Sequence, residues 1–112
     1  MATQLPLNVF RTRPFELTTA TQEIYISPSG YTAIVLGAQA SNISTQTVKI
    51  TFTMTKNAVD YILLKEFEIP KNDAIETTSG KLVLEEGCIV KASVSRNNSV
   101  IFVLSLLETS NV

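Results

Sequence analysis

Apolar and polar residues alternate in several segments of this chain. The clearest is residues 48–54, where Val, Ile, Phe and Met occupy the even positions and Lys or Thr the odd ones. Residues 88–94 repeat the pattern, with Lys91 and Ser93 among the odd positions. Successive side chains of a β-strand point to opposite faces. Each segment is therefore predicted to be a strand with one buried face and one face in water.

Turn residues separate the other candidate strands. Proline, asparagine and glycine suit tight turns, and they occur in the turn segments 28–30, 85–87 and 96–98. In residues 61–69 the apolar positions change parity, which predicts a bulge near Lys65 and Glu66. The further strands predicted from these signals are residues 23–27, 32–41, 61–69, 82–84 and 99–107.

Composition supports an all-β fold. The β-branched residues Val, Ile and Thr supply 34 of the 112 residues, and no segment groups helix formers at a helical period. Seven or eight short strands joined by turns predict an antiparallel β-sandwich or a jelly-roll-like fold. A chain of this length forms one domain.

The N-terminal segment lacks clear alternation and contains Pro6 and Pro14. Residues 1–15 are therefore predicted to form an extended arm, and residues 16–112 the single sandwich domain. The arm is predicted to dock on a neighbouring subunit with Phe10 and Phe15 as anchors. Its interface candidates are Phe10, Arg11, Arg13 and Phe15.

Two predicted strands carry apolar residues on both faces. Residues 32–40 place either Val35 or Leu36 outside the sandwich, and residues 99–107 place Ile101 and Val103 outside if Phe102 faces the core. A loop or the arm would cover these positions in a monomer, and a second subunit would cover them in an oligomer. Both explanations stay open, and the second makes Val35, Ile101 and Val103 interface candidates.

The remaining composition excludes several kinds of chemistry. The chain has no histidine and one cysteine, so a Ser–His–Asp triad, a Cys/His zinc site and an internal disulfide are impossible. Arg11 and Arg13 lie beside aromatic residues, but the net charge of −1 argues against a nucleic-acid role. Cys88 falls on an apolar position and is predicted to be a buried thiol. No enzyme activity, cofactor, metal, membrane span or small-molecule substrate is predicted.

Four segments, in order, resemble small β-sandwich structural proteins of tailed-bacteriophage virions, including cyanophages. They are residues 24–36 (IYISPSGYTAIVL), 67–74 (FEIPKNDA), 80–87 (GKLVLEEG) and 104–108 (LSLLE). The resemblance implies a non-enzymatic virion component, assembled in the host cytoplasm, whose partners are itself and other virion proteins. It assigns a role to no individual residue.

Two functions remain as expectations. One is an oligomeric exterior subunit, either a capsid decoration (cement) protein or a neck or tail attachment protein. The alternative is a receptor- or carbohydrate-binding module of a tail fibre. The chain has no tryptophan, and among its three tyrosines only Tyr31 lies in an evident turn, which favours the first.

Overall fold

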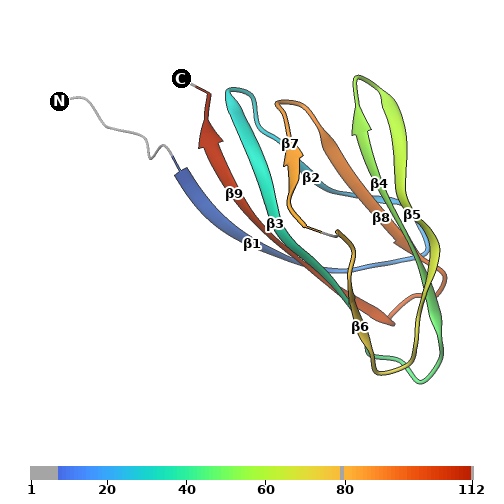
Figure 1. Ribbon diagram of the computed structural model, residues 1–112. Coiled ribbons are helices and arrows are strands. Elements are labelled where there is room, and N and C mark those ends of the chain that lie inside the picture. Colours follow the sequence, from blue (N-terminus) through green and yellow to red (C-terminus); the bar gives the residue numbers. More distant parts are fainter. Residues whose placement is uncertain (1–7, 79, 112) are drawn as a thin grey trace.

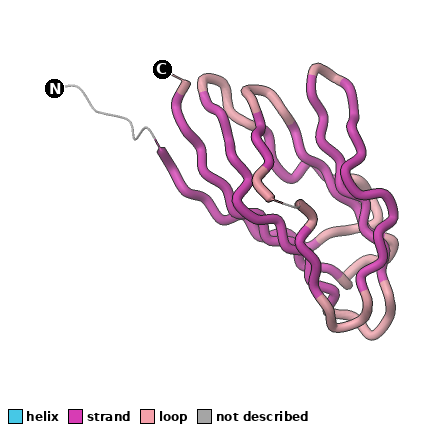
Figure 2. Tube along the Cα trace, in the orientation of Figure 1, coloured by secondary structure: helices cyan, strands magenta, loops and turns pink. Residues whose placement is uncertain are grey.

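The structure is a computed structural model that describes residues 8–78 and 80–111. Its regular elements in this part of the chain are nine β-strands, with no helix (Figures 1 and 2). The strands are β1 (Asn8–Glu16), β2 (Gln22–Ile26), β3 (Tyr31–Asn42), β4 (Val48–Lys56), β5 (Val59–Ile69), β6 (Ala74–Glu76), β7 (Leu82–Leu84), β8 (Ile89–Val94) and β9 (Val100–Ser110).

The strands form two antiparallel sheets that pack as a sandwich, as the sequence predicted. The first sheet has the order β1-β9-β3-β6, and β7 pairs with β3 beside β6. The second sheet has the order β2-β8-β4-β5. The two sheets enclose one core of inward-pointing side chains, because each of these strands has an apolar face to bury.

The centre of the core is an aromatic pair contributed by both sheets. Phe52 of β4 and Phe102 of β9 are fully buried, with ring centroids 5.7 Å apart and an interplanar angle of 27°. The predicted inward direction of Phe102 is therefore confirmed. Its neighbours on β9, Ile101 and Val103, consequently point to the outer face of the first sheet.

The bulge predicted in β5 is confirmed. Ile50 pairs with Phe67 and Phe52 pairs with Leu64, so Lys65 and Glu66 are an insertion opposite a single residue of β4. Glu66 has a φ of 49°, and its amide donates a hydrogen bond of 3.2 Å to Thr51 Oγ1 instead of to the backbone ladder. The insertion returns the apolar residues at the end of β5 to the core face.

The predicted boundary between arm and domain is wrong for the described residues. Residues 8–16 form strand β1, which pairs with β9 along its whole length, from Asn8 opposite Thr109 to Glu16 opposite Ile101. The strand lies at the edge of its sheet and seven of its nine residues are exposed, so it has no buried face to create alternation. Pro14 is tolerated because an edge strand needs no donor on its free side. Residues 1–7 of the predicted arm lie outside the described residues.

The prediction that Val35 is an interface residue on the outer face is also wrong. It pairs with Leu106, whereas Gly37 pairs with Ser105, so Leu36 is a bulge in β3. Val35 is fully buried in the core, and Leu36 is 42% exposed. The bulge lets Ala33 and Val35 before it, and Ala38 and Ala40 after it, all face the core.

Candidate interaction surface

Four apolar side chains form a line across the outer face of the first sheet. Phe10 of β1 pairs with Leu107 of β9, Leu107 pairs with Ile34 of β3, and Ile34 pairs with Val83 of β7. Paired residues of neighbouring strands share a face, so these four form one row, which we call the apolar row. It spans four adjacent strands, or roughly 14 Å at the usual strand spacing.

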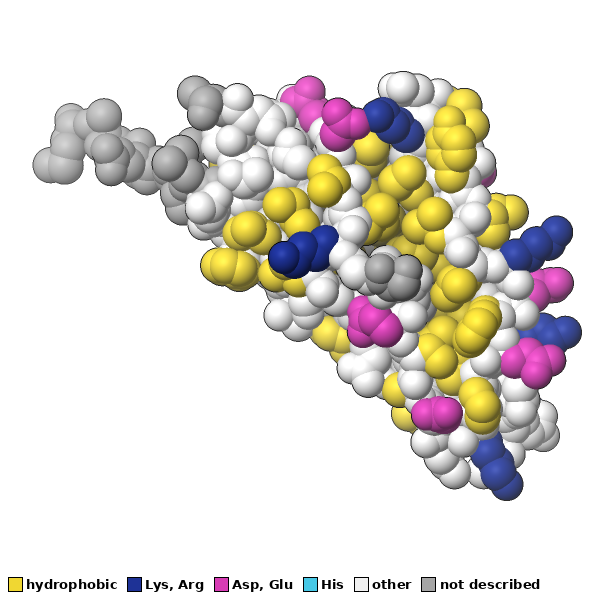
Figure 3. All heavy atoms as spheres, in the orientation of Figure 1, with side chains coloured by type: hydrophobic (Ala, Val, Ile, Leu, Met, Phe, Trp, Pro, Cys, Tyr) yellow, Lys and Arg dark blue, Asp and Glu magenta, His cyan; other side chains and the backbone are white. Residues whose placement is uncertain are grey.

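The apolar row is open to solvent at both ends. Phe10 is 73% exposed and Val83 is 55% exposed, while Ile34 and Leu107 between them are half-buried. Leu36, the bulge residue of β3, adds another exposed apolar side chain. Figure 3 shows hydrophobic side chains gathered over the strands of the first sheet. A contiguous apolar surface of this kind is typical of a protein–protein contact.

Ile101 and Val103 lie on the same outer face, further along β9. Ile101 is opposite Glu16 and Ser41, and Val103 is opposite Pro14 and Gln39. Both side chains are half-buried. Their outward direction agrees with the sequence analysis; their contact with another subunit stays a prediction.

The candidates from the former arm separate into two groups. Phe10, Arg11 and Arg13 are exposed. Phe15 pairs with Phe102, so it is on the inner face, where it packs partly buried against the core. Its predicted role as an external anchor is therefore wrong, because the register of β1 turns its side chain inward.

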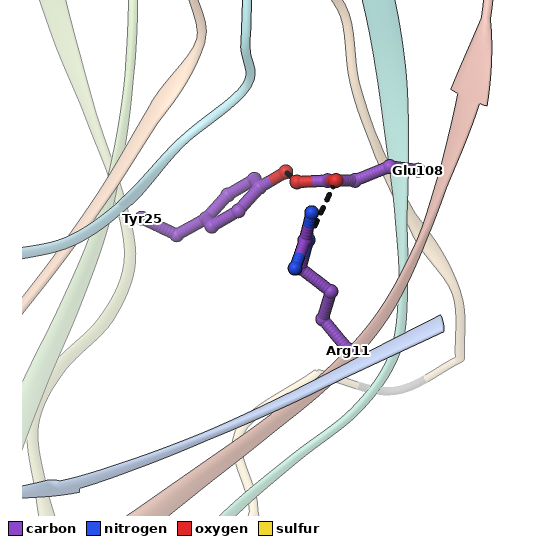
Figure 4. Close-up of polar contacts among 3 residues, drawn as sticks. All are labelled: Arg11, Tyr25 and Glu108. Atoms are coloured by element: carbon purple, nitrogen blue, oxygen red, sulfur yellow. Dashed lines mark hydrogen bonds and ion pairs between the residues drawn. The ribbon is translucent and has the colours of Figure 1, made fainter. Parts of the chain in front are cut away.

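Arg11, whose side chain is exposed, joins a polar cluster around the buried Glu108 that sequence reasoning missed. Its Nε donates a hydrogen bond of 2.8 Å to Glu108 Oε1, and the hydroxyl of Tyr25 donates to Glu108 Oε2 (Figure 4). Glu108 is 5% exposed and belongs to β9, whereas Tyr25 comes from β2 in the second sheet. The cluster therefore fastens the edge strand β1 and both sheets together on one side of the sandwich.

The electrostatics of the cluster keep Glu108 ionised. Burial disfavours its charged form, but the hydrogen bonds from Arg11 and Tyr25 and the positive charges of Arg11 and Arg13 together outweigh burial, and the pKa of Glu108 falls below its ordinary value. Burial, and then the hydrogen bond to Glu108, raise the pKa of Tyr25. The signal in the sequence is that Glu108 has the same parity as the core residues Phe102 and Leu106, which is unusual for an acid.

A groove opens on the opposite side of the sandwich, between β5 and the short strands β6 and β7. It has a volume of about 410 Å³. In Figure 3 this face is hollowed and hydrophobic side chains follow its right-hand border. Apolar side chains from both sheets line it: Leu63, Leu64, Phe67, Ile75 and Leu82.

Strand β5 concentrates exposed apolar side chains beside this groove. Ten large hydrophobic side chains of the described residues are exposed, and five of them belong to β5. The five are Val59, Tyr61, Ile62, Leu63 and Phe67. The sequence has apolar residues on both parities of this strand. The sequence analysis explained this change of parity by the bulge alone and did not predict an exposed apolar surface.

The described residues offer little for catalysis or cofactor binding. They contain no group of three or more His, Cys, Asp or Glu side chains that could hold a metal ion. Cys88 is free and buried, as its position predicted. Within the same part of the chain, no helix is long and apolar enough to cross a membrane.

Comparisons with known proteins show the fold. No protein-family model and no curated protein matches this sequence. The acidic stable capsid structure of Helicobacter pylori bacteriophage KHP30 has a similar chain, with a TM-score of 0.57 and 14% identity over 93% of this chain and 88% of that one.

Two further structures are similar. A chain of the disulfide-linked pili that form Bacillus endospore appendages has a TM-score of 0.55 and 8% identity, over 92% of this chain and 86% of that one. The nucleoplasmin-like N-terminal domain of Drosophila FKBP39 has a TM-score of 0.51 and 11% identity, over 98% and 96%. At these identities the likeness establishes a shared β-sandwich fold.

Proposed function

We propose that this protein is a non-enzymatic structural subunit of a tailed-bacteriophage virion, and that it assembles through the outer face of its first sheet. The observation that carries the proposal is the apolar row Phe10–Leu107–Ile34–Val83, which crosses the sheet on its solvent side. The similarity in fold to a bacteriophage capsid chain supports it.

The mechanism requires only a rigid sandwich and an apolar surface. Burying apolar area releases roughly 25 cal/mol per Å², and a preformed sheet has little entropy left to lose on association. Binding to a lattice of neighbours then stabilises the folded subunit by mass action. The place in the particle would be the exterior, as a capsid decoration subunit or a neck or tail attachment subunit, with assembly in the host cytoplasm.

The same surface argues against a carbohydrate-binding module. Stacking against sugars uses exposed aromatic faces, whereas the apolar row and the groove are built mainly from aliphatic side chains, with Phe10 and Phe67 as the exceptions. A broad sheet face without deep polar pockets suits a protein partner better.

The proposal is tested on particles of the phage that carries this gene. Quantitative mass spectrometry of purified particles should find this chain in many copies per particle. An abundant non-virion protein of the same infected cells is the control, and it should be depleted. If the chain is abundant in infected cells and is depleted from particles to the same degree as the control, it is not a virion subunit.

A further inference from the structure

The sandwich has two long free edges, one in each sheet. The edge strands of the first sheet are β1, with nine residues, and the three-residue strands β6 and β7. The edge strands of the second sheet are β2, with five residues, and β5, with eleven. A long unpaired edge offers a row of free backbone donors and acceptors to another strand.

The two long edges lie on opposite sides of the molecule. Strand β1 is on the side closed by Arg11, Glu108 and Tyr25, where it lies next to β2. Strand β5 is on the side of the groove, next to β6 and β7. Figure 1 shows β1 and β5 at opposite borders of the sandwich. Copies placed side by side therefore bring β1 of one next to β5 of the other.

The two sides also match in shape and in apolar character. On the β1 side, Phe10 is the most exposed large apolar side chain at 73%, and it projects from an edge strand. On the β5 side, the groove is hollow and Leu63 and Phe67 form its apolar wall. A projecting aromatic side chain and an apolar groove on one molecule are the two halves of an interface between copies.

The charges of the edge strands favour a contact of β1 with β5 over a contact of β5 with β5. Arg11 of β1 is ion-paired with Glu108, and Asp60 of β5 is ion-paired with Lys91. The other charged residues are Arg13 and Glu16 on β1, which cancel, and Lys65, Glu66 and Glu68 on β5, with a net charge of −1. Two copies of β5 placed together would bring two net negative charges together, whereas β1 carries no net charge that would oppose β5. Like charges placed together at an interface disfavour that pairing.

We infer that this chain associates head to tail, with the β1 edge and Phe10 of one copy seated against β5 and the groove of the next. Such an interface is heterologous, because each copy contributes two different surfaces, and it generates a ring or a filament instead of a closed two-fold dimer. The inference deepens the proposed function and rests on it. It names the partner of Phe10, which is the β1 end of the apolar row, as the groove of a second copy.

The first step of the test introduces one charge on each surface. Phe10→Asp alters the β1 side, and Phe67→Asp or Leu63→Asp alters the groove. All three side chains are exposed, so circular dichroism should show the wild-type fold. Each variant alone should lose assembly and scatter light as a 12.3 kDa monomer. The control Thr45→Asp, in an exposed loop, should assemble like wild type.

The second step mixes the two kinds of variant. Each Phe67→Asp molecule keeps an intact β1 side, and each Phe10→Asp molecule keeps an intact groove. An equimolar mixture should therefore form a 1:1 species of twice the monomer mass and nothing larger. Retained assembly of Phe67→Asp and of Leu63→Asp alone, or a mixture that stays monomeric, overturns the head-to-tail inference. A wild type that is monomeric at all concentrations overturns it as well.

The test separates this inference from the proposed function. If Phe10→Asp prevents assembly while Phe67→Asp and Leu63→Asp assemble normally, the outer face of the first sheet still joins the copies, but it meets another surface. The virion proposal is tested independently by the abundance of the chain in purified particles.

Discussion

At the scale of single residues, the most unusual side chain is Glu108. It occupies a core-facing position of β9, yet it remains ionised because Arg11 and Tyr25 donate to its two oxygens. A buried carboxylate with both oxygens bonded is costly to disturb, because removing its charge weakens the acceptors of both partners. Glu108 therefore links the stability of the sandwich to the docking of its edge strand.

Neutralising Glu108 should destabilise the fold. Glu108→Gln keeps the shape of the side chain but weakens both hydrogen bonds, so the free energy of unfolding should fall by about 1–3 kcal/mol. Urea unfolding followed by circular dichroism measures this loss. Glu23→Gln, at an exposed position of β2, is the matched control and should change little. Equal stability of both variants would show that the cluster contributes nothing.

Acid should weaken the same cluster. Since the pKa of Glu108 is lower in the folded state than its ordinary value of about 4.3, the unfolded chain binds more protons in the acidic range. Its contribution is complete above pH 4.3 and is lost as the pH falls through the lowered folded pKa. Urea midpoints measured from pH 6 to pH 2 should fall less steeply for Glu108→Gln than for wild type. Parallel curves would contradict this assignment.

At the scale of elements, the strands could be predicted where burial creates a pattern. The bulge of β5 is visible because the apolar parity changes from Leu64 to Phe67. The bulge at Leu36 is hidden, because β3 has apolar residues on both faces and either register satisfies the pattern. Strand β1 is hidden because it is exposed on both faces. The apolar row was unpredictable for a related reason: it depends on the register between β1, β9, β3 and β7, which no single segment encodes.

The pairing of β1 makes a prediction about truncation. A chain that begins at Glu16 lacks most of the strand that covers the edge of β9, and it leaves Glu108 without Arg11. It should unfold at a clearly lower urea concentration than a chain that begins at Asn8, which retains every described strand. Equal midpoints for the two chains would mean that β1 is an appendage, as the sequence first suggested.

At the scale of the whole molecule, the sandwich has two apolar surfaces that adjoin at β7. One is the outer face of the first sheet, with the apolar row, Ile101 and Val103; the other is the groove beside β5. The core is closed and contains no cluster suited to metal chemistry among the described residues. We propose that the protein contacts its neighbours through the outer face of the first sheet.

The most direct test of this claim is the light-scattering mass of Ile101→Lys beside that of wild type. In a monomer the lysine would extend into water next to Glu16, its neighbour across β1 and β9, and the fold would persist. In an assembly it would be buried without a partner, at a cost of several kcal/mol. Wild type should form oligomers, and the folded variant should scatter as a 12.3 kDa monomer. A variant with the wild-type oligomeric mass would contradict the account.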